Sequence, residues 1–250
     1  MKRLNIILVS ITLLIASMNV SFAQIAIRVD LCMPTYKTTC FDPIQLSRVS
    51  GLGLQFGVDY DIHVKNKFHI TPGLYLSCRA ALADASDEGT VGSELLQENF
   101  INVPIHTKWK FDVKPGKFAV YLFIGPTFSW AMSSRSYLDM AVSGYQIQGT
   151  YDYLDGRVDV EVPGFSDSVS DELNALLQKE FDAAGIRHND FEGRLDWGIG
   201  LVFKDNYELV LIGYDFGLNN KYAGTHGDKY YMACDNYYIG FRYRFGGKDR

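Results

Sequence analysis

Charged and titratable residues recur at every second position in several segments of the sequence. They are Asp59, Asp61, His63, His106, Lys108, Lys110, Arg194, Asp196, Asp215, Arg242 and Arg244. Carboxylates among such residues could perform acid–base chemistry if their surroundings shifted their pKa values. Because basic partners are available for the carboxylates, we instead predict an interior network of ion pairs with a structural role.

The residue patterns of known active sites are missing from the sequence. There is no Ser–His–Asp order, no nucleophile elbow and no metal-binding motif. Gly51 and Gly53 match part of a dinucleotide fingerprint, but no helix is expected after them. We therefore predict a protein without enzymatic activity, cofactor or metal ion.

Two histidines could form a smaller site. His63 and His69 lie equally far along the chain from Asn66, so they are expected to face each other across a turn and to point inward. A hydrogen-bonded pair is the simpler interpretation, and a bound metal ion is the alternative. His106 lies too far from this turn to complete a metal site.

The charged residues belong to segments in which apolar residues alternate strictly with polar or small ones. Only a β-strand converts a period of two into two faces. The eight segments with this pattern are 25–31, 51–64, 68–80, 101–113, 118–132, 195–203, 208–218 and 237–245. Most reach the roughly 9 to 11 residues that a tilted strand needs to cross a bilayer, whereas strands of globular proteins usually have about five or six.

The connections between these segments alternate in length. Short turns are predicted at 65–67, 114–116 and 204–206, and long loops at 32–48, 81–98, 133–192 and 219–235. Outer-membrane barrels have short periplasmic turns at one rim and long extracellular loops at the other. We therefore predict an all-β fold, an eight-stranded antiparallel transmembrane β-barrel whose apolar faces contact lipid.

The first 23 residues have the features of a secretory signal peptide. Lys2 and Arg3 precede a short apolar stretch, and small residues precede a cleavage site expected after Ala23. The whole chain has 24 basic side chains, so residues 24–250 retain 22 basic side chains after removal of Lys2 and Arg3. Against 29 acidic side chains, this gives a net charge of −7. This charge argues against nucleic acid as a partner. The mean hydropathy of −0.05 fits strands that are apolar on one face only.

The segment 133–192 contains a predicted helix at about residues 170–184. Ser170 is a suitable N-cap, and Gly185 is a suitable stop. Leu173, Leu176, Leu177 and Phe181 follow at helical spacing. We expect this helix to pack over the barrel mouth and to bury its apolar stripe, with docking of a partner as the alternative.

Four cysteines, Cys32, Cys40, Cys78 and Cys234, are expected at the extracellular end of the barrel. An oxidising compartment permits disulfides. The first and last strands of a closed barrel are neighbours, which favours Cys32–Cys234 and leaves Cys40–Cys78. A local Cys32–Cys40 bridge and free thiols are the alternatives.

Several motifs resemble the PorT-like outer-membrane β-barrel family over residues 24–246. They are NFINVPIHTKWKF followed by YLFIGPTFSW, then NDFEGRLDWGIGLVF, LVLIGYDFGLNN and the closing YYIGFRYRF. The resemblance implies location in the outer membrane of a Gram-negative bacterium, and one class of the family is linked to protein secretion. It also implies that Tyr243 and Phe245 present an assembly signal to the barrel-assembly machinery, although the tail 246–250 departs from the usual terminal aromatic residue.

These observations predict a non-enzymatic protein whose extracellular loops bind or scaffold a partner in a surface or secretion assembly. Its expected partners are outer-membrane lipid, the barrel-assembly machinery and a protein of that assembly. Two alternatives remain. One is a barrel enzyme that acts on outer-leaflet lipid or peptide, for which the candidate residues are Ser133, Ser134, His188 and His226. The other is a soluble periplasmic lipocalin-like carrier of an apolar ligand.

Overall fold

The computed structural model describes residues 23–39, 49–87, 90–142, 144–184, 187–221 and 231–245. The predicted signal peptide lies outside these ranges apart from Ala23, as do Cys40 and His226.

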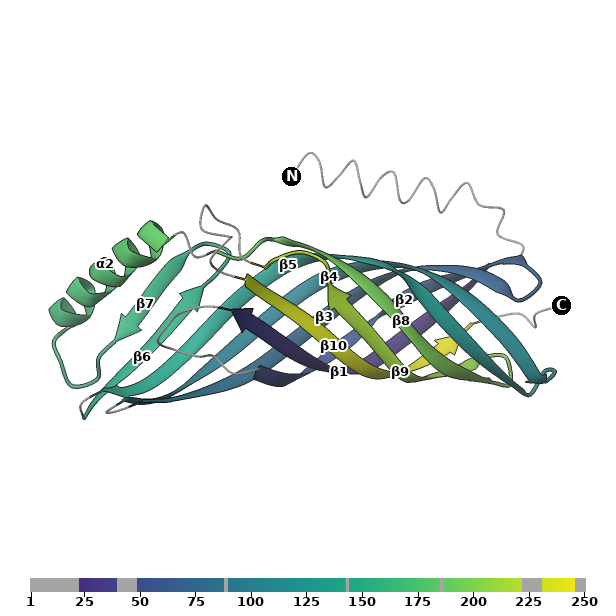
Figure 1. The fold of residues 1–250 in the computed structure, drawn as a ribbon, viewed down its shortest axis with the longest axis horizontal. Coiled ribbons are helices and arrows are strands. Elements are labelled where there is room, and N and C mark those ends of the chain that lie inside the picture. Colours follow the sequence, from purple (N-terminus) through teal and green to yellow (C-terminus); the bar gives the residue numbers. More distant parts are fainter. Residues whose placement is uncertain are drawn as a thin grey trace.

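Eight strands form a closed antiparallel ring (Figure 1). They are β1 (Ala23–Thr39), β2 (Val49–Lys65), β3 (Phe68–Asp87), β4 (Thr90–Lys114), β5 (Phe118–Val142), β8 (Phe191–Phe203), β9 (Tyr207–Gly217) and β10 (Tyr231–Arg244). Each strand pairs with its neighbours along the chain, β5 pairs with β8, and β1 pairs with β10 to close the ring. The predicted eight-stranded barrel is therefore confirmed.

The outer face of this ring is apolar and the inner face is polar. On β2, Leu52, Leu54 and Phe56 are more than half exposed, whereas Asp59 and Asp61 are almost fully buried. Aromatic pairs mark both ends of the apolar band, with Phe118–Phe203 beside the short turns and Trp130–Phe191 toward the other rim. This distribution is that of a barrel in a bilayer, with aromatic residues at the two interfaces.

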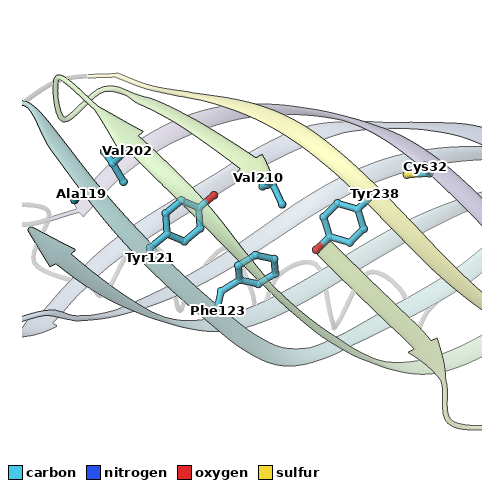
Figure 2. Packing of buried hydrophobic residues seen from close by; sticks show 7 residues of the cluster. All are labelled: Cys32, Ala119, Tyr121, Phe123, Val202, Val210 and Tyr238. Carbon is cyan, nitrogen blue, oxygen red and sulfur yellow. The ribbon is translucent and has the colours of Figure 1, made fainter. Parts of the chain in front are cut away.

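Aromatic side chains fill the lumen beside glycines of the adjacent strands. The directly opposite pairs are Gly57–Tyr75, Gly198–Phe123, Gly200–Tyr121 and Gly213–Tyr238. A Cβ atom at position 213 would lie 2.1 Å from the Tyr238 ring. Figure 2 shows the rings of Tyr121, Phe123 and Tyr238 inside the barrel, near Val202 and Val210. The inward-facing glycines thus provide space for large rings in a narrow interior.

The strands β3, β4 and β5 continue beyond the predicted limits and build an extension on one rim. The predicted loops 32–48 and 219–235 are also shorter than expected, because β1 and β10 remain paired as far as Thr39 and Tyr231. Residues 81–98 are not a long loop, because β3 and β4 remain paired as far as Asp87 and Thr90. The predicted loop 133–192 contains the end of β5, the strands β6 (Tyr145–Asp152) and β7 (Arg157–Glu161), and the helix α2 (Asp167–Ala184). Outside the bilayer no strand face has to contact lipid, so these parts lack the apolar alternation on which the prediction relied.

The helix α2 begins at Asp167 rather than at Ser170. It lies against β7 at the far end of the extension, and not over the barrel mouth as predicted (Figure 1). Leu176, a member of its apolar stripe, is 56% exposed. In the described part of the chain, helical segments lack the length and apolarity that crossing a membrane requires.

Candidate functional site

The lumen contains a balanced charge network near the short turns. Its members, here called the lower network, are Asp59, Asp61, Lys108, Glu208, Arg242 and Arg244, all buried. Arg242 Nε donates to Asp59 Oδ2 at 2.7 Å, and Arg244 Nη2 donates to Asp61 Oδ2 at 2.8 Å. Glu208 accepts hydrogen bonds from Lys108 at 2.9 Å, from Arg242 at 2.9 Å and from Arg244. Three carboxylates thus face three cations, so the net charge of this network is zero.

A second layer lies halfway along the barrel. Arg28 Nε donates to Asp30 at 2.8 Å, and its guanidinium lies 5.1 Å from the centre of the Tyr238 ring. Tyr238 in turn donates its hydroxyl to Asp196 at 2.6 Å. His106 Nε2 lies 2.8 Å from the other oxygen of Asp196. These contacts combine ion pairs with ring packing and leave little open space.

A third layer, the upper network, lies toward the rim that carries the extension. It contains Arg79, Glu98, Glu192, Arg194, Asp215 and Lys221, all buried. Lys221 Nζ donates to Glu192 at 2.6 Å and to Glu98 at 2.8 Å. Arg194 donates to Glu192 at 2.8 Å and from Nε to Asp215 at 2.7 Å.

A cavity of about 10 Å³ lies between the middle and upper layers. Its lining residues are Gln55, Tyr75, Arg79, Asn102, Thr127, Arg194, Asp196 and Asp215. This volume holds about one water molecule. The cavity is too small for an organic ligand.

The structure places most of the predicted interior residues in these layers, with two exceptions. His63 does pair with His69 across the turn, with ring centroids 4.9 Å apart, but its side chain is exposed. The two side chains share one face of the sheet, but His63 is exposed beside the turn, whereas His69 is buried with its Nδ1 2.9 Å from Asp61 Oδ1. Lys110 contacts Asp205 of a turn at 3.4 Å.

The ion-pair network predicted from the sequence omits several charged residues of the lumen. They are Arg28, Asp30, Arg79, Glu98, Glu192, Glu208 and Lys221. Glu208 was missed because β9 contains a bulge, in which Leu211 and Ile212 both face outward and reverse the alternation. In the sequence, this bulge is indicated by two consecutive apolar residues, Leu211 and Ile212, directly before Gly213. Lys221 enters from a connection after β9, where no periodicity marks it.

The structure brings together two residues of the alternative enzyme hypothesis. Ser134 Oγ lies 2.9 Å from His188 Nδ1 and donates to Glu98 Oε1 at 3.1 Å. A catalytic triad would need the carboxylate on the imidazole nitrogen opposite the serine, whereas here Glu98 and Ser134 lie on the same side of the ring. Ser134 is buried. Burial, reinforced by Lys221, lowers the pKa of His188 to about 3, which makes it a poor general base near neutral pH.

The preferred Cys32–Cys234 disulfide is not formed. Both thiols are free, because the strand register places Cys32 opposite Tyr238 and Cys234 opposite Tyr36. Cys78 is also a free thiol and is exposed on the outer face of β3. The proposed partner Cys40 lies outside the described residues.

Comparisons with known proteins give one family match. The sequence model of the outer membrane protein beta-barrel domain family matches residues 22–222. A comparison with curated proteins finds no match.

Solved structures with a similar arrangement include three bacterial proteins. Neisserial surface protein A is 11% identical, with 89% of this chain and 99% of that chain covered and a TM-score of 0.42. The attachment invasion locus protein Ail of Yersinia pestis, solved with the heparin analogue sucrose octasulfate, is 10% identical, with 90% and 99% covered and a TM-score of 0.37. An outer membrane channel from Pseudomonas putida F1 is 8% identical, with 90% and 96% covered and a TM-score of 0.29.

Proposed function

The chain belongs to the outer membrane protein beta-barrel domain family, and we propose that its barrel is a sealed anchor that displays a protein-binding surface outside the cell. The observation that carries this proposal is the combination of a filled lumen with a sheet that projects beyond one rim. The three charged layers and the intervening rings occupy the space that a channel or a ligand pocket would need. The projecting sheet is thus the large surface left for recognition.

The extension is built as a display surface. The strands β3, β4 and β5 continue from the barrel wall into it, so it is held by the same ladders that form the barrel. Among the described residues, the connections at the opposite rim are short turns, and outer-membrane barrels place such turns in the periplasm. The extension therefore belongs on the extracellular side.

The charge of the extension supports a basic partner. Residues 144–184 contain nine acidic and two basic side chains, a net charge of −7, against −5 for the whole chain. Residues 24–250 together carry the same net charge of −7, so the rest of that part is neutral overall and the acidic character is concentrated where a partner would approach. Surfaces of this kind steer and select partners of opposite charge.

The absence of enzymatic activity is part of the proposal. It is supported by the geometry of Ser134 and His188, which lacks the arrangement of a nucleophile and its base. The resemblance to the PorT-like family suggests a secretion assembly as the setting. In the same proposal a signal peptide directs export, and Tyr243 with Phe245 engages the assembly machinery.

Two measurements test this function. In a planar bilayer the purified chain should give no stable conductance steps, because the ion pairs block the lumen. In cells, a photoreactive residue at position 176 of α2 should form a discrete adduct with another protein, whereas one at the lipid-facing position 54 should not. Conductance steps, or the absence of an adduct at position 176, would contradict the proposal.

A further inference from the structure

The outer edge of β7 is covered by side chains rather than by a strand. Gln178 of α2 accepts from the Val158 amide at 3.0 Å and donates to the Gly156 carbonyl at 2.7 Å. Asn174 accepts from the Val160 amide at 2.5 Å and donates to the Val160 carbonyl at 3.0 Å. Ser170 Oγ accepts from the amide of Val162 at 3.3 Å. Five backbone hydrogen bonds of the edge are therefore made with a helix.

The spacing of Ser170, Asn174 and Gln178 allows α2 to cover the edge of β7. Ser170, Asn174 and Gln178 follow at intervals of four, so they form one row on the face of α2 that meets β7. The backbone groups that bind α2 belong to even-numbered residues of β7, whereas the backbone groups of the odd-numbered residues are directed toward β6. The row of polar side chains thus imitates the backbone of an additional strand, and it protects an edge that would otherwise invite pairing.

We propose that this edge of β7 is a strand-addition site, and that α2 is its resident cover. This proposal rests on the binding role proposed for the extension. The partner is an extended segment in which apolar and basic residues alternate. An antiparallel strand placed beside β7 would form hydrogen bonds with the backbone groups of this edge. The backbone groups on the facing side of the added strand would be paired by the same bonds.

The two faces of β7 specify the side chains of that segment. Val158 and Val160 lie on the shielded face, so the opposite residues of an added strand should be apolar. Asp159 and Glu161 lie on the exposed face, where basic residues opposite them would form cross-strand pairs. The net charge of −7 on residues 144–184 favours the same basic partner.

The attachment of α2 is suited to displacement. The polar row is held to β7 by the side-chain hydrogen bonds of three residues, and Leu176 on the outer side of α2 is exposed. The connection to β7 contains Gly164 at a φ of +91°, a conformation that side chains rarely adopt. A strand that makes a full backbone ladder could therefore replace the helix at this edge.

The test uses the full chain in detergent micelles and short peptides of defined chemistry. The probe is a peptide of alternating lysine and valine. One control peptide has glutamate in place of lysine. The other keeps the lysine–valine sequence but is N-methylated along its backbone, so it has the same charge and cannot form a ladder.

Two variants of the chain separate the cover from the edge. N174A/Q178A removes four of the five bonds of the cover, and its matched control K179A/E180A changes two exposed residues of α2 without altering the net charge. The third variant adds V158P to N174A/Q178A, which removes one amide donor from the edge.

We expect the lysine–valine peptide to bind N174A/Q178A roughly tenfold or more tightly than the native chain, since each lost bond otherwise competes with the peptide. K179A/E180A should bind like the native chain, and V158P should abolish the gain. Equal binding of the N-methylated peptide would overturn strand addition in favour of simple charge attraction. Equal binding by N174A/Q178A and the native chain would overturn the role of α2 as a cover.

A second copy of the chain is the competing occupant. If N174A/Q178A forms dimers that V158P reverses, and the peptide does not compete, the edge would pair with itself and the basic partner would be wrong. These outcomes are separate from the cellular adduct at position 176, which tests whether the extension binds any protein.

Discussion

Glu208 is the residue whose loss should weaken the barrel most clearly. Its carboxylate accepts hydrogen bonds from Lys108, Arg242 and Arg244, and it is 1% exposed. The substitution Glu208→Gln keeps the size of the side chain and an acceptor oxygen but removes the charge. Three buried cations would then face only Asp59 and Asp61.

The cost follows from the loss of charge balance. Removal of one partner from a buried ion pair costs about 3–5 kcal/mol. Because glutamine retains part of the hydrogen bonding, we expect the free energy of unfolding to fall by about 3 kcal/mol. The double variant Lys108→Met with Glu208→Gln restores two cations against two carboxylates, so it should cost about 1–3 kcal/mol less than the sum of the single variants.

The assay is denaturant unfolding of the chain folded into lipid vesicles, with the shift in gel mobility on boiling as a measure of the folded barrel. Asp205→Asn is the matched control, because Asp205 contacts Lys110 at 3.4 Å from a partly exposed turn. This control should cost under about 1 kcal/mol. If Glu208→Gln costs no more than Asp205→Asn, or if the double variant is simply additive, the lower network does not stabilise the barrel as argued.

Three further predictions concern the mouth, the lumen and the lipid face. Burial lowers the pKa of His188 to about 3 from 6.5, so between these two pH values the unfolded chain binds more protons than the folded chain. Acidification from pH 6.5 to pH 5 should therefore lower the free energy of unfolding by about 1.5 kcal/mol. A His188→Asn variant should lack this part of the pH dependence. Gly213→Ala should cost about 1–3 kcal/mol through its clash with Tyr238, whereas Gly193→Ala, with only one neighbouring atom at 3.9 Å, should be nearly neutral in the same unfolding assay. Leu54→Arg should cost about 2–4 kcal/mol in a bilayer, and equal stability of this variant in vesicles would contradict the lipid-facing assignment of β2.

The membrane-spanning part of the fold could be predicted from the sequence because lipid imposes a strict requirement there. Every outward residue of β2 from Leu52 to Val58 must be apolar, so a period of two is visible in the residues themselves. Beyond the rim this requirement ends, and the strands that continue through residues 81–98 pair without an apolar outer face. The prediction therefore failed where the bilayer stops.

The interior was less predictable because bulges and long connections determine part of it. The bulge at Leu211 and Ile212 reverses the alternation in β9, so Glu208 was assigned to no face although it joins the lower network. Glu98 and Lys221 meet across 123 positions of sequence, and no local pattern relates them. Alternation indicates which residues face inward, but the partner of each charge depends on the register of the closed ring.

The most direct test of the account is the side of the membrane on which each rim lies. Single cysteines would be introduced as Leu176→Cys in α2 and Asn66→Cys in a short turn, in a background without the native cysteines, and intact cells would be treated with a membrane-impermeant maleimide. We predict that position 176 is labelled on intact cells and that position 66 is labelled only after the outer membrane is permeabilised. Labelling of position 66 on intact cells, or equal labelling of both positions, would contradict a barrel that holds its extension outside the cell.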